Sequence, residues 1–173
     1  MSELKLLLPD ESWRGAIEEF KQEYVQANSA MDGTSGLSSQ DFDSWLEKNI
    51  RNRSPETVAP GLVPSTTYLS VRLSDGRLIG MIDIRHYLNE GLRLHGGHIG
   101  YSIRPSERRK GYAKEQLRLA LEKCRELGIE KALVTCDKKN LGSARTILAN
   151  GGVLENEVED GERITQRYWI QVK

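Results

Sequence analysis

The six residues RRKGYA, from Arg108 to Ala113, place three cations and a glycine directly before a helix-like segment. The first amides of a helix have no partners within the helix, and the helix dipole adds positive potential there. Gly111 permits a positive φ or the close approach of a ligand, and Arg108, Arg109 and Lys110 can donate charge-assisted hydrogen bonds to phosphate oxygens. The segment is thus a candidate phosphate site, although a solvated basic turn explains the same six residues more simply when they are taken alone.

The segments around this loop predict the elements that would position it. Residues 98–104 alternate apolar and polar side chains, which is typical of a strand. Residues 114–127 carry one apolar stripe at helical spacing, and residues 131–136 form a near-continuous apolar run, as expected of a strand covered on both faces. The loop thus opens the helix of a central strand–helix–strand unit.

The rest of the chain predicts a mixed sheet in one α/β domain over residues 1–173. An Asp-Gly turn separates two alternating runs and indicates a hairpin, and Ser38 with Asp41 resembles a capping box before a helix. The expected strands cover residues 4–9, 66–73, 78–85, 98–104, 131–136, 152–158 and 163–172, and the helical patterns cover 13–27, 42–50, 114–127 and 144–148. The resulting order is β, α, α, β, β, β, α, β, α, β, β.

The composition excludes several classes of function. Twenty-five Lys and Arg balance twenty-five Asp and Glu, so no overall field favours a nucleic acid or a membrane as partner. No apolar run is long enough to span a membrane, and no leader sequence stands at the start. Cys124 and Cys136 form no disulfide framework, which indicates a reducing cytoplasm.

Residues 98–152 resemble the GNAT family of acetyl-CoA-dependent N-acetyltransferases. In that family a strand is followed by (Gln or Arg)-x-x-Gly-x-(Gly or Ala) at the start of a helix, and here Arg108, Gly111 and Ala113 match. A downstream asparagine and glycine are matched by Asn140 and Gly151. The resemblance implies the GNAT acyl-CoA N-acyltransferase fold, a mixed, mostly antiparallel sheet of about six to seven strands with helices on both faces.

The resemblance also implies that acetyl-CoA lies between two splayed strands and that no metal is needed. Its pyrophosphate would lie on the amides of residues 109–113, and amides near Ser102 and Ile103 would hold the pantetheine arm and polarise the thioester carbonyl. A primary amine would then attack directly in a ternary complex. The cofactor-binding residues expected on this basis are Ser102, Ile103, Arg108, Arg109, Lys110, Gly111, Tyr112, Ala113, Asn140 and Ser143.

The sequence departs from the family pattern at the catalytic acid. Many members carry a tyrosine seven residues after the asparagine, where this chain has Ile147, and Gly152 and Thr135 stand at two further positions where members carry an aromatic residue and a glutamate. Tyr112 and Tyr168 are alternative acids, although each is better explained as a packed aromatic residue with its hydroxyl at the surface.

His98 is the strongest candidate for the catalytic base, because relatives place an acidic residue at its position and imidazole titrates near neutral pH. A structural histidine at a strand start is an equally good interpretation. Tyr101 is expected to be core or pantetheine wall. Cys136 fits an inert small hydrophobe better than a nucleophile.

A zinc site built from His86, His95 and His98 is disfavoured, since the three lack helical spacing and an acidic or cysteine partner. The segment 85–97 is better interpreted as a loop bordering the acceptor site. Asp83, Asn89 and Glu90 could meet a cationic amine there, and solvation of a surface explains them as well.

These observations favour a cytoplasmic N-acetyltransferase acting on a small-molecule or peptide amine. The chain is compatible with a homodimer. The alternative is a non-catalytic acyl-CoA-binding regulatory module, which the absent tyrosine supports. Small polyamines, antibiotics, amino acids and protein N-termini are all compatible acceptors.

Overall fold

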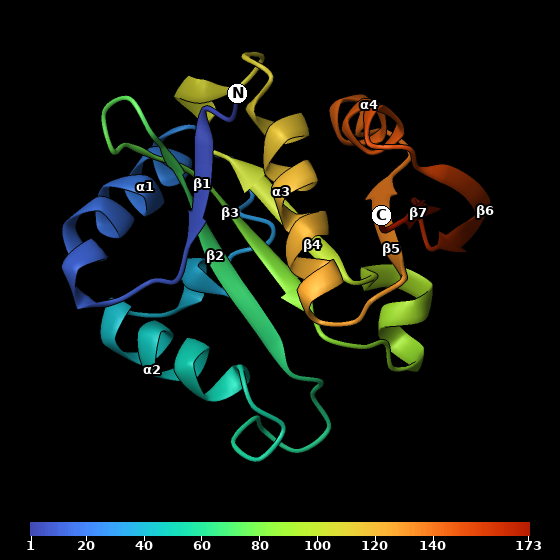
Figure 1. Cartoon of the computed structure of the whole chain (residues 1–173), viewed down its shortest axis with the longest axis horizontal. Coiled ribbons are helices and arrows are strands. Elements are labelled where there is room, and N and C mark those ends of the chain that lie inside the picture. The colour runs from blue at the N-terminus through green and yellow to red at the C-terminus, as the bar shows by residue number, and fades with distance from the viewer.

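In the computed structural model, which describes residues 1–173, seven strands form one sheet in the order β1-β2-β3-β4-β5-β7-β6 (Figure 1). The strands are β1 (Leu4–Leu7), β2 (Ser65–Arg72), β3 (Leu78–Arg85), β4 (Ile99–Ile103), β5 (Lys131–Asp137), β6 (Val153–Asp160) and β7 (Arg163–Gln171). The helices are α1 (Arg14–Gln26), α2 (Phe42–Asn52), α3 (Tyr112–Glu126) and α4 (Leu141–Ala149). The predicted element order is confirmed.

The sheet is antiparallel everywhere except at its centre, where β4 and β5 run parallel. Their pairing is limited to Ile99 opposite Val134, whereas the neighbouring β3–β4 pairing continues as far as Gly80 opposite Ile103. The chain crosses from β4 to β5 through α3, as a parallel connection requires. The two strands therefore separate after one residue pair, and the predicted parting toward Ile103 and Cys136 is present.

Helices cover both faces of the sheet, α1 and α2 on one face and α3 and α4 on the other (Figure 1). The face under α1 and α2 is filled by a cluster that includes Phe20 and Trp45, both fully buried. The opposite face is filled by a cluster in which Leu117 of α3 and Ile147 of α4 pack on β3, β4, β5 and β7. Strand β5 contributes to this core with an almost unbroken apolar run, because it is enclosed by its neighbours.

Two local predictions need correction. The N-cap of α2 is Asp41, whose Oδ1 accepts a hydrogen bond from the Ser44 amide at 2.9 Å, and not Ser38. The reason is that Ser38 lies within a short 3-10 turn and Gln40 is extended, so the helix cannot begin before Asp41. The expected loop 85–97 also contains a helical turn, Leu92–Gly96. None of the helices combines the length and the apolar character needed to cross a membrane.

Candidate active site

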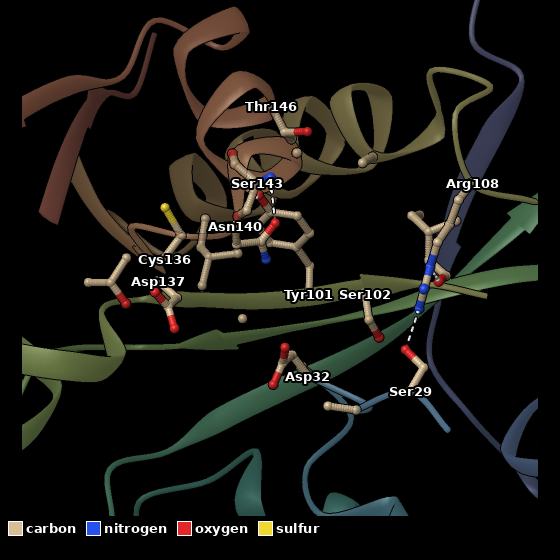
Figure 2. A pocket seen from close by; sticks show the side chains of 18 of the residues that line it. Ser29, Asp32, Tyr101, Ser102, Arg108, Cys136, Asp137, Asn140, Ser143 and Thr146 are labelled. Carbon is tan, nitrogen blue, oxygen red and sulfur yellow. Dashed lines mark hydrogen bonds between the residues drawn. The ribbon is translucent and has the colours of Figure 1, made fainter. Parts of the chain in front are cut away.

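A cleft of about 1000 Å³ opens where β4 and β5 separate. Its walls come from β4, the end of β5, the loop before α3, the start of α4 and the loop that follows α1. Figure 2 shows Ser29 and Asp32 of the loop after α1 on one side of this cavity, and Asn140, Ser143 and Thr146 on the other. The cleft thus lies between the two halves of the sheet.

The loop before α3 has the backbone that an anion site needs. Gly111 is the residue before the first turn of α3 and has a φ of 86°, a left-handed conformation that suits glycine. Arg109 also has a positive φ, 62°. No side chain caps the start of α3, so the first amides of the helix are free to meet a ligand.

The three cations of this loop have different surroundings. The Arg108 guanidinium donates to the Ile103 carbonyl at 3.0 Å and to Ser29 Oγ at 2.9 Å, and it therefore braces the loop. Lys110 does not line the cleft, and its ammonium donates to the Glu107 carboxylate, 2.9 Å away. Arg109 lines the cleft, and its guanidinium forms no hydrogen bond or ion pair. The same holds for the ammonium of Lys114 in the first turn of α3.

A buried carboxylate fixes the turn that precedes the loop. Glu107 is 3% exposed and contacts Lys110, Arg72 and Arg77 at 2.9, 3.1 and 3.0 Å. The hydrogen bond from Lys110, followed by the charges of Arg72 and Arg77, holds the pKa of Glu107 below its ordinary value despite its burial. Breaking this cluster would leave a buried charge without a partner, so it keeps the loop in place.

Two hydroxyl groups meet on the wall formed by β4 and α4. Tyr101 and Ser143 Oγ lie 2.7 Å apart, and Asn140 caps α4 by accepting a hydrogen bond from the Ser143 amide at 3.1 Å. Burial raises the pKa of Tyr101 to about 12, so its hydroxyl keeps its proton near neutral pH. Tyr101 both packs against the core and lines the cleft, as predicted.

Of the expected cofactor-binding residues, the cleft brings together all except Lys110. Those that line it are Ser102, Ile103, Arg108, Arg109, Gly111, Tyr112, Ala113, Asn140 and Ser143. Tyr112 is buried, and its hydroxyl accepts a hydrogen bond from Arg72 at 3.2 Å, which favours a packing role.

His98 does not line the cleft. It is 7% exposed, its amide donates to the Leu133 carbonyl at 2.7 Å, and its Nδ1 accepts from the Leu133 amide at 2.9 Å. Burial, followed by the charges of Arg93 and Arg85, lowers the pKa of His98 to about 4. A pKa this low disfavours His98 as the base, and these contacts favour a structural role that joins β4 to β5.

The other candidate catalytic and metal-binding residues are packed or hydrogen-bonded within the fold. Burial raises the pKa of the Cys136 thiol, consistent with an inert side chain. Tyr168 donates to Gln166 at 2.9 Å. No cluster of three or more histidine, cysteine or acidic side chains could hold a metal ion.

The family's tyrosine and aromatic positions are both closed to their usual residues. Ile147 is fully buried in the core. Gly152 lies against it, and a Cβ at Gly152 would collide with Ile147 Cγ2. An aromatic side chain therefore has no room here without repacking α4 on the sheet.

The segment expected to border the acceptor site has mostly internal contacts. Asp83 is 5% exposed and bonds to Thr67 and Arg85 at 2.9 and 3.0 Å, and burial raises its pKa in spite of the Arg85 cation. Asn89 accepts a hydrogen bond from the Leu92 amide and begins the helical turn. Glu90 does not line the cleft, whereas Arg85 and His95 do.

Sequence reasoning missed the loop after α1, residues 27–36, as a wall of the cleft. Gly33 of this loop packs directly on the backbone of Gly100 and Tyr101, where a Cβ would overlap the Gly100 carbonyl. A positive φ of 67° suits the same glycine. The sequence signal was only a turn-rich composition, because the contact joins residues far apart in the chain.

Comparisons with known proteins agree with this geometry. A family profile described as "Acetyltransferase (GNAT) domain" matches residues 13–153. A search of curated proteins found no match.

Similar solved structures share the fold at low sequence identity. The ribosomal-protein-S5-alanine acetyltransferase of Vibrio fischeri is 13% identical, with a TM-score of 0.75 over 100% of this chain and 95% of that one. A Salmonella typhimurium acetyltransferase that modifies the N-terminal serine of ribosomal protein L7/L12 is 16% identical, with a TM-score of 0.71 over 100% and 97%. The microcin C7 self-immunity acetyltransferase MccE, determined with acetyl-CoA and AMP, is 13% identical, with a TM-score of 0.68 over 99% and 94%. On the evidence of the family match, this chain belongs to the GNAT acetyltransferases, which transfer the acetyl group of acetyl-CoA.

Proposed function

We propose that this acetyltransferase acts on a primary amine, which attacks the thioester of acetyl-CoA directly while both substrates are bound. The observation that carries the proposal is the separation of β4 and β5 after the Ile99–Val134 pair, which opens one continuous cleft from the start of α3 to the loop after α1. A cleft of about 1000 Å³ has room for a cofactor arm and an acceptor together.

The cofactor end of the cleft is the start of α3. The free amides around Gly111 would bind the pyrophosphate, with Arg109 and Lys114 adding positive charge. The pantetheine arm would run along β4 past Ser102 and Ile103, and a strand amide there would stabilise the negative charge that grows on the thioester oxygen. Asn140 and Ser143 line the same stretch from the opposite side.

The leaving thiolate needs a proton, and Tyr101 is the proposed donor. Tyr101 lines the cleft, and its hydroxyl is hydrogen-bonded to Ser143 and is protonated at neutral pH. Tyr101 on β4 would thus supply from another element the acid that the usual position, Ile147, lacks.

For the acceptor, the similar structures offer one guide. Two of the similar structures are described as acting on the N-terminal residue of a ribosomal protein, alanine of S5 and serine of L7/L12. A peptide N-terminus is therefore the first acceptor to try, beside small amines. We also propose a cytoplasmic location, since Cys124 and Cys136 are both free thiols.

One assay tests the proposal. The protein is incubated with acetyl-CoA and, in turn, spermidine, L-lysine, an aminoglycoside, and tetrapeptides beginning with serine or alanine, while free thiol is monitored. We expect thiol release that depends on one of these amines and a matching acetylated product by mass spectrometry. Tight binding of CoA without thiol release from any amine would overturn the proposal and would fit the acyl-CoA-binding module instead.

A further inference from the structure

Three carboxylates line the cleft, and two of them have partners. Glu107 is paired with three cations. Asp137 Oδ1 accepts a hydrogen bond from the Lys139 amide at 3.0 Å and shapes the turn that leads into α4. Asp32 is the remaining one, exposed and without a hydrogen bond or ion pair to any protein group.

The loop that carries Asp32 is held firmly in place. The Trp45 indole donates to the Thr34 carbonyl at 2.7 Å in the buried core, and Thr34 is 1% exposed. On the other side of Asp32, Ser29 accepts a hydrogen bond from Arg108. The position of Asp32 is therefore set by contacts on both sides, as a residue that orients a substrate requires.

Asp32 also lies at the right end of the cleft. Its neighbour Gly33 contacts the backbone of Gly100 and Tyr101, two to three residues before Ile103 on β4. If the pyrophosphate lies at Gly111 and the arm runs back along β4, the thioester reaches this stretch. Figure 2 shows Asp32 in the cavity across from the α4 wall.

The cations at this end leave Asp32 available. The Arg85 guanidinium contacts Asp83 at 3.0 Å and donates to the Gly96 carbonyl at 3.3 Å. Lys139 and Arg163 line the cleft beside Asp137 at the end of β5. None of the three forms an ion pair with Asp32.

We propose that Asp32 is the acceptor-side catalytic residue, which accepts a hydrogen bond from the attacking amine and then takes its proton. The inference rests on the proposed amine acceptor. The ammonium form of the amine first loses one proton to water. The nitrogen lone pair then forms the N–C bond, the C–S bond breaks, and the N–H proton, which becomes strongly acidic once nitrogen carries positive charge, passes to the Asp32 carboxylate. The thiolate receives the proton of the Tyr101 hydroxyl. The proton held by Asp32 then passes through solvent to the Tyr101 phenolate, so both side chains return to their starting forms.

Two substitutions separate proton transfer from orientation. In Asp32→Asn the side-chain oxygen still accepts a hydrogen bond but is a far weaker base, so we expect kcat to fall about 100-fold with little change in the KM of the amine. In Asp32→Ala both functions are lost, so the KM should also rise, about tenfold. Asp32→Glu should restore part of the kcat lost in Asp32→Asn.

The matched control is Asp160→Asn, which removes the same charge from an exposed, unpaired aspartate outside the cleft and should leave kcat within about threefold of the parent. Calorimetry with CoA should give the parent affinity for all variants, since the Asp32 carboxylate forms no hydrogen bond or ion pair with the loop before α3. Turnover by Asp32→Asn equal to that of Asp160→Asn would overturn this inference and leave the proposed function intact. Absence of turnover by the parent with every amine tried would overturn both.

Discussion

The burial of His98 predicts a specific weakening of the fold in mild acid. In the folded protein His98 Nδ1 accepts a hydrogen bond from the Leu133 amide. Burial, followed by the charges of Arg93 and Arg85, lowers the pKa of His98 to about 4. In the unfolded chain an imidazole has a pKa of about 6.5. Between these values the unfolded state binds a proton that the folded state does not, so the free energy of unfolding falls as the pH drops from about 6.5 toward 4.

The magnitude follows from the two values. Each pH unit between them is worth about 1.4 kcal/mol, which gives roughly 3 kcal/mol over the full window and about 2 kcal/mol between pH 7 and pH 5. That is a large share of the stability of a domain this size, which is on the order of 10 kcal/mol.

His98→Asn isolates this contribution, because asparagine Oδ1 follows the same bond path as Nδ1 and can accept the Leu133 amide without titrating. Urea unfolding at pH 7 and pH 5 measures it. We expect the variant to be less stable at pH 7, through lost packing, and the gap to the parent to narrow by about 2 kcal/mol at pH 5. His95→Asn, at an exposed histidine, should keep the pH dependence of the parent. A gap that stays constant within about 0.5 kcal/mol would refute the reasoning.

Three further changes test the cleft. Gly111→Val forces a β-branched residue into a left-handed conformation before α3 and should weaken CoA binding at least about tenfold in calorimetry. The control Gly61→Val, at an equally left-handed and open position outside the cleft, should keep the CoA affinity of the parent, and equal affinities of the two variants for CoA would contradict the proposed site. Arg109→Ala should weaken CoA binding without lowering the melting temperature, whereas Arg108→Ala should also lower the melting temperature, because it removes the hydrogen bonds to Ile103 and Ser29. A melting temperature lowered by Arg109→Ala and not by Arg108→Ala would exchange the roles of the two arginines. Tyr101→Phe should keep CoA affinity and lower kcat about 100-fold, and parental turnover in that variant would remove Tyr101 as the acid.

The fold was predictable where local patterns and long-range structure agree. Strand β3 was predicted at its observed bounds, Leu78–Arg85, because alternation and the preceding Asp-Gly turn both indicate a hairpin. The backbone of the loop before α3 was predictable for a similar reason, since Gly111 indicates a left-handed residue at a helix start. The cap of α2 was misassigned because Ser38 and Asp41 both suit a helix start, and only the turn over Leu37–Ser39 decides between them.

The wall that we propose as the acceptor side could not be predicted, since its residues are brought together by tertiary contacts. The sequence around Asp32 does not indicate that Gly33 contacts Gly100. It also does not indicate that the Trp45 indole donates a hydrogen bond to the Thr34 carbonyl of the same loop. The contacts that favour a structural role for His98 were also hidden from the sequence. The residue type and strand position of His98 suited catalysis, but the sequence does not show that its partner is the backbone of Leu133 on the neighbouring strand.

The contacts of Arg108 suggest why the two ends of the cleft are built into one unit. Its guanidinium reaches from the phosphate loop to the Ile103 carbonyl and to Ser29, and Ser29 belongs to the loop that carries Asp32. The residue that matches the first position of the family motif is therefore expected to position the loop that carries Asp32, and the proposed phosphate site is left to Arg109 and the first amides of α3. A charge placed directly on the cofactor would improve its binding alone, whereas a brace between the two loops fixes the distance between thioester and amine. In the proposed direct attack the rate depends on that distance, so the Arg108 brace is expected to contribute to the rate by fixing it.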